Sequence, residues 1–215
     1  MDPQQIDVIV RVAGATLLLF AAVAPRGRMT GARLWFIPFA ICLCGFLAGN
    51  SPLPELRLSG PLSTLAMFLA GYAAVFLWWF CLAVFDSRFR PRGAVLAVGL
   101  AWIGIASADR GLFGPRLEEA GLSRVLVVLG LVMIGHLAWR VLRDREGDLL
   151  DRRRRMRRAV VVALAGQLLA DIAVDLILGF DWSPQAFSIL QNTAFLAFTG
   201  WMLSLTEREP SPVRA

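Results

Sequence analysis

Seven long apolar segments, separated by short stretches rich in arginine, proline and glycine, dominate this sequence of 215 residues. About 20 helical residues cross the hydrocarbon core of a bilayer, which is about 30 Å thick. Transmembrane β-strands read as short segments of alternating polarity, whereas these segments are continuously apolar. Because backbone polar groups find no water in lipid, such segments fold as helices. The sequence therefore predicts an all-α fold, a polytopic transmembrane bundle of about seven helices.

The predicted helices end at clusters of proline, glycine and asparagine, which break helices. They cover residues 6–25, 34–50, 61–85, 93–108, 122–142, 159–180 and 184–205. The fourth is shorter than a bilayer crossing usually requires. We expect one transmembrane domain over residues 1–205 and a short cytoplasmic tail over residues 206–215.

The positive charge of the chain comes from arginine alone, since the sequence contains no lysine. The arginines gather in the first, third and fifth connections between the predicted helices, and the alternate connections carry little net charge. Basic connections stay in the cytoplasm, which predicts a multi-pass protein of the inner membrane with its N-terminus outside and its C-terminus inside. The absence of lysine excludes a retinal Schiff base, which a count of seven helices otherwise suggests.

Six polar side chains on three predicted helices are expected to share the outer leaflet. They are Arg11, Gln167, Asp171, Asp175, Gln191 and Asn192. A charge at the membrane centre costs about 2.5–3.5 kcal/mol on insertion scales, so such groups usually face a partner or a water-filled cavity. Two interpretations stay open: an internal ion pair and hydrogen-bond set that includes Asp7 and fixes helix packing, or an outward-facing pocket. The pocket would take a small polar or cationic ligand or respond to protons. Snorkelling to the surface is a third interpretation.

The sequence offers little for catalysis or metal binding. His136 is the one histidine, and Cys42, Cys44 and Cys81 all lie inside apolar segments, where small buried side chains explain them. No HExxH motif and no Ser/His/Asp set is found. We expect a non-catalytic protein without metal or cofactor, with ligation of a haem or pigment by His136 left open.

A basic run precedes the sixth predicted helix and contains Arg152, Arg153, Arg154 and Arg155. Such a run beside a membrane helix is typical of contact with anionic lipid headgroups. Docking of a cytoplasmic protein is the alternative. Nucleic acid is not an expected partner, because the run has no interleaved aromatic residues and abuts the membrane.

Two segments resemble a known family. The first runs from Trp79 to Pro91 (WFCLAVFDSRFRP), and the second, from Gly147 to Arg157 (GDLLDRRRRMR), precedes a helix with acidic residues. Both are similar to parts of the membrane region of membrane-bound AraC-type transcriptional regulators. The resemblance implies about seven helices with basic cytoplasmic connections, which in that family precede a helix-turn-helix domain. The residues that would bind DNA are absent here, so DNA binding is not carried over; the chain is expected to be either a truncated regulator or a free-standing relative of the sensor region.

The hypothesis that unites these features is a seven-helix membrane sensor that reads a small ligand or the state of the membrane. An accessory subunit of a larger membrane complex is the alternative, with a protein partner or self-association as its expected property. A small transporter ranks third, since the sequence shows no internal repeat.

Overall fold

A computed structural model describes residues 2–23, 31–51, 53–86, 88–118, 120–143, 151–178 and 185–207, and within these ranges it describes the backbone alone at 54, 118, 151–157, 175 and 201–207. The described residues form helices and no strand. The long helices are α1 (Pro3–Val23), α2 (Gly31–Gly49), α3 (Pro61–Phe85), α4 (Gly93–Asp109), α6 (Ser123–Arg143), α7 (Asp151–Leu178) and α8 (Gln185–Glu207). Two short turns, η1 (Pro54–Leu56) and α5 (Pro115–Glu118), lie in connections. The predicted fold class is confirmed.

The helix bounds differ from the predicted ones mainly at the beginnings. α3 has the predicted bounds, whereas α1 begins three residues early, at Pro3. Asp2 accepts a hydrogen bond from the backbone N–H of Gln4 at 3.2 Å, and proline is favoured in the first helical turn. α7 begins eight residues early, at Asp151, so the predicted loop arginines 152–158 belong to a helix.

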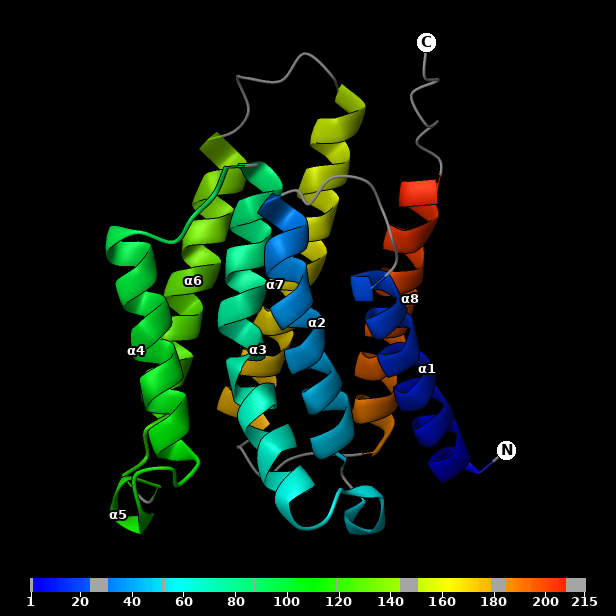
Figure 1. The fold of residues 1–215 in the computed structure, drawn as a ribbon, viewed down its shortest axis with the longest axis vertical. Helices are drawn as coiled ribbons and strands as arrows, with labels where there is room; N and C mark the ends of the chain where they lie inside the picture. The colour runs from blue at the N-terminus through cyan, green and yellow to red at the C-terminus, as the bar shows by residue number, and fades with distance from the viewer. Residues whose placement is uncertain are drawn as a thin grey trace.

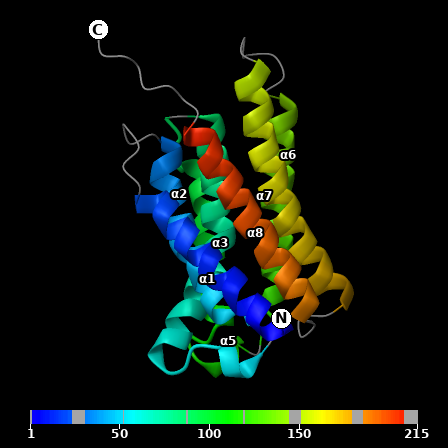
Figure 2. The same ribbon diagram turned by 90° about the vertical axis from the view of Figure 1, so that its right-hand side faces the viewer.

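The long helices run alternately up and down, so α1 begins at one end of the bundle and α8 ends at the other (Figure 1). We call these ends the N-terminal face and the C-terminal face. α3 is central and contacts α2, α4, α6 and α7, while α8 packs mainly on α1, which in turn packs on α2. The α1/α8 pair thus forms one side of the bundle, which Figure 2 shows from that side.

The most extensive helix pair, α2 and α3, packs through glycines and aromatic rings. A Cβ atom built on Gly49 would lie only 3.1 Å from the Cβ of Ala66, so the two backbones approach closely at this point. Nearer the C-terminal face, Trp35 of α2 meets Trp79 of α3 edge-on at a centroid distance of 4.9 Å. Offset and edge-on ring pairs of this kind stabilise beyond the area they bury.

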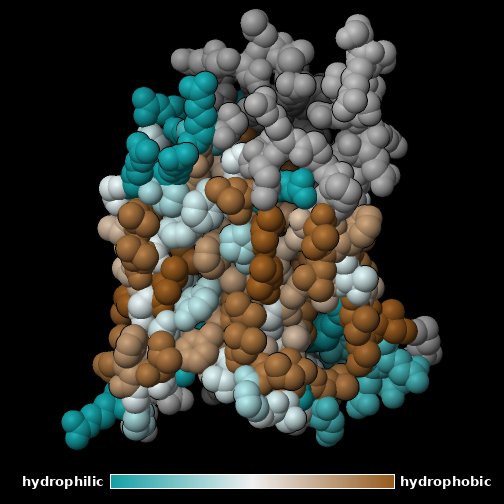
Figure 3. Space-filling view, in the orientation of Figure 1, coloured by the Kyte–Doolittle hydropathy of each residue, from teal (hydrophilic) through white to brown (hydrophobic). Residues whose placement is uncertain are grey.

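The outer surface of the helices is apolar, as a lipid environment requires. α1, α2, α3, α6 and residues 158–178 of α7 are each long and apolar enough to cross a membrane, and α4 is a shorter apolar helix of 17 residues. α8 has 23 residues, and amide side chains interrupt its apolar sequence. Figure 3 shows a largely apolar band between hydrophilic ends. The chain is therefore an integral membrane protein.

Candidate functional site

Arg11 is the centre of a buried polar network at the junction of α1, α2 and α8. Its Nε donates to Asp7 Oδ2 at 2.9 Å, one turn earlier on α1. Its terminal nitrogens donate to the carbonyls of Leu47 (2.6 Å) and Asn50 (3.0 Å) and to Ser188 Oγ on α8 (2.6 Å). The two carbonyls lie at the C-terminus of α2, where the helix dipole is negative and carbonyls lack helical partners. One guanidinium therefore ties three helices together.

Asp7 and Asn192 complete this network between α1 and α8. Asp7 is fully buried, and its Oδ1 accepts from Asn192 Nδ2 at the long distance of 3.5 Å. The same Nδ2 donates to Ser188 Oγ at 3.3 Å. Asn192 is 1% exposed, and its Oδ1 is buried with no donor among the described residues. The network therefore leaves one buried acceptor without a donor from the part of the chain that the structure describes.

A second polar group joins α7 to α8. Asp171 Oδ1 accepts from Gln191 Nε2 of α8 at 2.6 Å and from Gln167 Nε2 at 3.3 Å. Gln191 is buried, whereas Gln167 and Asp171 are half-buried. Among the described residues, α7 and α8 share few other contacts, so this cluster is an important link between them.

The structure brings the predicted site residues together in two groups that meet on α8. Gln191 reaches Asp171 of α7, and its neighbour Asn192 reaches Asp7 of α1. The side chain of Asp175 lies outside the described residues. Sequence reasoning missed Ser188 and the α2 carbonyls, because a serine near a helix end and a backbone oxygen carry no sequence signal of their own.

A further set of polar contacts lies between α3 and α4. Trp102 Nε1 donates to the carbonyl of Gly71 at 2.8 Å, and the hydroxyls of Tyr72 and Ser107 lie 2.7 Å apart. Arg110 donates to the carbonyl of Met67 at 2.9 Å. These contacts satisfy groups on two packed helices and offer no group that is placed to react.

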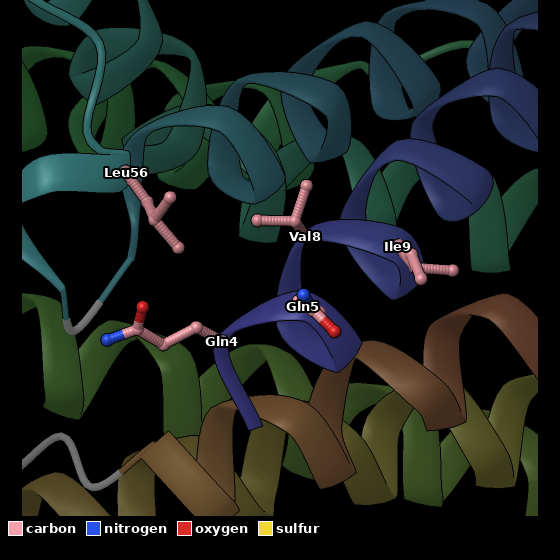
Figure 4. Close-up of a pocket in the computed structure, with 5 residues that line it drawn as sticks. All are labelled: Gln4, Gln5, Val8, Ile9 and Leu56. Atoms are coloured by element: carbon pink, nitrogen blue, oxygen red, sulfur yellow. The ribbon is translucent and has the colours of Figure 1, made fainter. Parts of the chain in front are cut away.

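An open groove of about 430 Å³ lies at the N-terminal face beside the first turns of α1. Gln4, Gln5, Val8, Ile9 and Leu56 line it, and Figure 4 shows Gln4 and Leu56 on opposite sides of the gap. Four of the five lining residues belong to α1, the helix that carries Asp7.

His136 and the cysteines lie among apolar or aromatic groups. The ring of His136 lies 5.6 Å from that of Trp78 and 5.8 Å from that of Trp139. Cys42 and Cys81 are buried, as expected, and Cys44 is half-buried with its thiol 3.7 Å from the carbonyl of Ala15.

No protein family model, no curated protein and no solved structure matches this chain.

Proposed function

We propose that this chain is a non-catalytic sensor or signalling module of the bacterial inner membrane, and that the α1/α8 pair carries the signal. The observation that carries the proposal is the position of α8 between two polar groups. Ser188 and Asn192 bind the α1 network, while Gln191 binds Asp171 of α7. A ligand or proton that changes either group shifts the balance between the α1 and α7 contacts of α8.

The proposed direction of signalling follows from the direction in which α8 passes from one face of the bundle to the other. Its residues that belong to the two polar groups, Ser188, Gln191 and Asn192, lie near the N-terminal face, and its last residue, Glu207, lies at the C-terminal face. We assign the N-terminal face to the outside, because basic connections favour the cytoplasm. A displacement of α8 at the outer network then reaches the cytoplasmic end as a movement of one helix.

The Oδ1 of Asn192, which has no donor among the described residues, supports a second arrangement of the network. A buried acceptor without a donor costs about 1–3 kcal/mol, and a conformation that supplies a donor recovers that cost. The expected ligand is small and carries hydrogen-bond donors or positive charge, because Asp171 and Asn192 present oxygens. A ligand can shift the equilibrium only by its difference in affinity for the two arrangements.

The resemblance to the membrane region of AraC-type regulators supports the same proposal. In that interpretation a cytoplasmic partner binds the end of α8 and responds to its position, and the basic residues 152–155 contact anionic lipids. An accessory subunit is the alternative, and it predicts a stable complex with other membrane proteins by native mass spectrometry.

The test is the distance between α7 and α8 on the side of the two polar groups that is towards the C-terminal face. Spin labels on Val162→Cys and Ala197→Cys, both exposed, in a background without native cysteines report this distance by pulsed electron resonance. We expect the distribution to change with pH or with a panel of small amines and amino acids. Asp171→Asn is expected to abolish the change.

The matched control is Asp86→Asn, because Asp86 is an exposed carboxylate beyond α3 and far from the network in sequence. A distribution that stays constant under every condition contradicts the proposal. So does an Asp171→Asn variant that responds as the wild type does. Fusions of a reporter enzyme to residue 207 test the proposed cytoplasmic side separately.

A further inference from the structure

Five arginines near the C-terminal face form no ion pair among the residues that the structure describes. They are Arg88, Arg90 and Arg92, between α3 and α4, and Arg140 and Arg143, in the last turn of α6. Four of the five are exposed, and Arg140 is half-buried. The nearby carboxylate of Asp86 accepts from the backbone N–H of Arg88 at 2.9 Å. Among the described residues, this end of the protein therefore concentrates positive charge that no ion pair neutralises.

The end of α3 and the end of α6 lie at the same height. Both helices run in the same direction (Figure 1), and the rings of Trp78 and His136 meet at 5.6 Å. From this contact α3 continues to Phe85 and α6 to Arg143, which is about 10 Å on each helix at 1.5 Å per residue. The arginines after α3 thus begin at the height where α6 ends.

α4 completes this arrangement, since it begins directly after Arg92 and packs against both α3 and α6. Figure 3 shows a hydrophilic patch at the upper left, where Figure 1 places the α3–α4 connection and the end of α6. We call the five arginines together with Trp139 the α4–α6 rim.

Trp139 gives the rim an apolar wall that faces lipid. Its side chain and that of Leu142 are 48% and 58% exposed on the outside of α6. The guanidinium of Arg143 lies 5.1 Å from the centre of the Trp139 ring. Tryptophan prefers the level of the headgroups, and arginine reaches from there towards the phosphates. From the interior of the membrane outward, apolar side chains are therefore followed by cationic ones, which matches the order of tails and phosphate in a phospholipid.

We propose that the α4–α6 rim binds the headgroup of an anionic phospholipid in the leaflet at the C-terminal face. The unpaired charge selects an anionic lipid over a zwitterionic one, and guanidinium groups bind phosphate through paired N–H donors. This site uses other residues than the lipid contact expected at residues 152–155, and it does not depend on the sensor function.

The experiment measures binding of phosphatidylglycerol and phosphatidylcholine to the purified full chain by native mass spectrometry, with lipid titrated into detergent. A juxtamembrane arginine contributes about fivefold to the affinity for an anionic surface. Arg140→Gln/Arg143→Gln is therefore expected to weaken binding of phosphatidylglycerol about 25-fold and to leave phosphatidylcholine unchanged. Trp139→Leu tests the apolar wall and is expected to weaken binding of both lipids.

The matched control is Arg116→Gln/Arg124→Gln, which removes the same charge from exposed arginines near the N-terminal face. The result that supports the proposal is a loss in the rim variant and wild-type binding in the control. Equal loss in both variants would show attraction by net charge alone and overturn the proposal. Loss confined to a variant of residues 152–155 would overturn it as well. Far-ultraviolet circular dichroism identifies a variant that fails to fold, in which case the single substitution Arg143→Gln replaces it.

Discussion

Replacement of Arg11 by methionine tests whether the buried network holds the α1/α8 pair on the bundle. The substitution keeps an apolar stem of similar length but removes four donated hydrogen bonds, to Asp7, Leu47, Asn50 and Ser188. It also leaves the carboxylate of Asp7, which is fully buried, without its counter-charge. Removal of one partner of a buried ion pair costs about 3–5 kcal/mol. We expect the free energy of unfolding to fall by that amount.

The double variant Asp7→Asn/Arg11→Met separates the ion pair from the packing. Because it removes both charges, it leaves no buried carboxylate unpaired, and it is expected to lose about half as much stability as Arg11→Met. Unfolding by sodium dodecyl sulfate in mixed micelles, followed by circular dichroism, measures both variants and the single variant Asp7→Asn. Arg124→Met, at an exposed arginine on α6, is the control and should stay within about 0.5 kcal/mol of the wild type.

Two outcomes would refute this reasoning. One is an Arg11→Met variant that unfolds at the wild-type midpoint, since the network would then contribute nothing to stability. The other is a double variant whose loss equals the sum of the single losses, since the two charges would then not interact in the native state.

Three further predictions, which use five substitutions, concern packing and hydrogen bonding, and the same unfolding assay tests each of them. Gly45→Ala places a Cβ against that of Leu69 and is expected to lower the free energy of unfolding by about 1–3 kcal/mol. A Cβ on Gly135 meets open space, so the control Gly135→Ala should be neutral or slightly stabilising. Equal effects of the two substitutions would contradict the close approach of α2 and α3. Trp102→Phe loses the 2.8 Å hydrogen bond to a backbone carbonyl, whereas Trp79→Phe removes an indole N–H that has no partner among the described residues. Trp102→Phe should therefore lower the free energy of unfolding by about 1 kcal/mol more than Trp79→Phe does. A larger loss for Trp79→Phe would count against the hydrogen bond of Trp102. Ser188→Ala removes an acceptor of Arg11 and is expected to cost about 1–2 kcal/mol, and an unchanged midpoint would show that this bond is dispensable.

The helix positions could be predicted because the bilayer leaves the backbone little choice. An apolar run with proline or glycine at its ends has to satisfy its own hydrogen bonds, and for residues 61–85 this reasoning gave the observed bounds. The beginnings of α1 and α7 were less predictable, since capping by Asp2 and the helical propensity of an arginine run extend helices beyond the apolar segment. Hydropathy measures where a segment is apolar, and a helix often begins before that point.

The candidate site could be predicted only as a set of residues at similar depth. The level of Arg11 relative to Asn192 follows from counting residues along each helix, and the observed contacts agree with it. The sequence left an internal ion pair open, and the structure places it between Asp7 and Arg11, whose i, i+4 spacing favours such a pair. No such count shows which side of α8 faces which neighbour.

The sequence by itself determined that this chain crosses a membrane, where its long helices lie and which costly polar groups they carry, because each of these properties depends on a single segment and its solvent. Only the tertiary structure decided that α8 packs on α1, that Asn192 and Gln191 reach different helices, and that Arg11 binds the end of α2. Lipid is as apolar as the helix surfaces, so hydrophobicity does not select the neighbour of each helix. That selection depends on side-chain packing and on hydrogen bonds between helices, which form only when the bundle assembles.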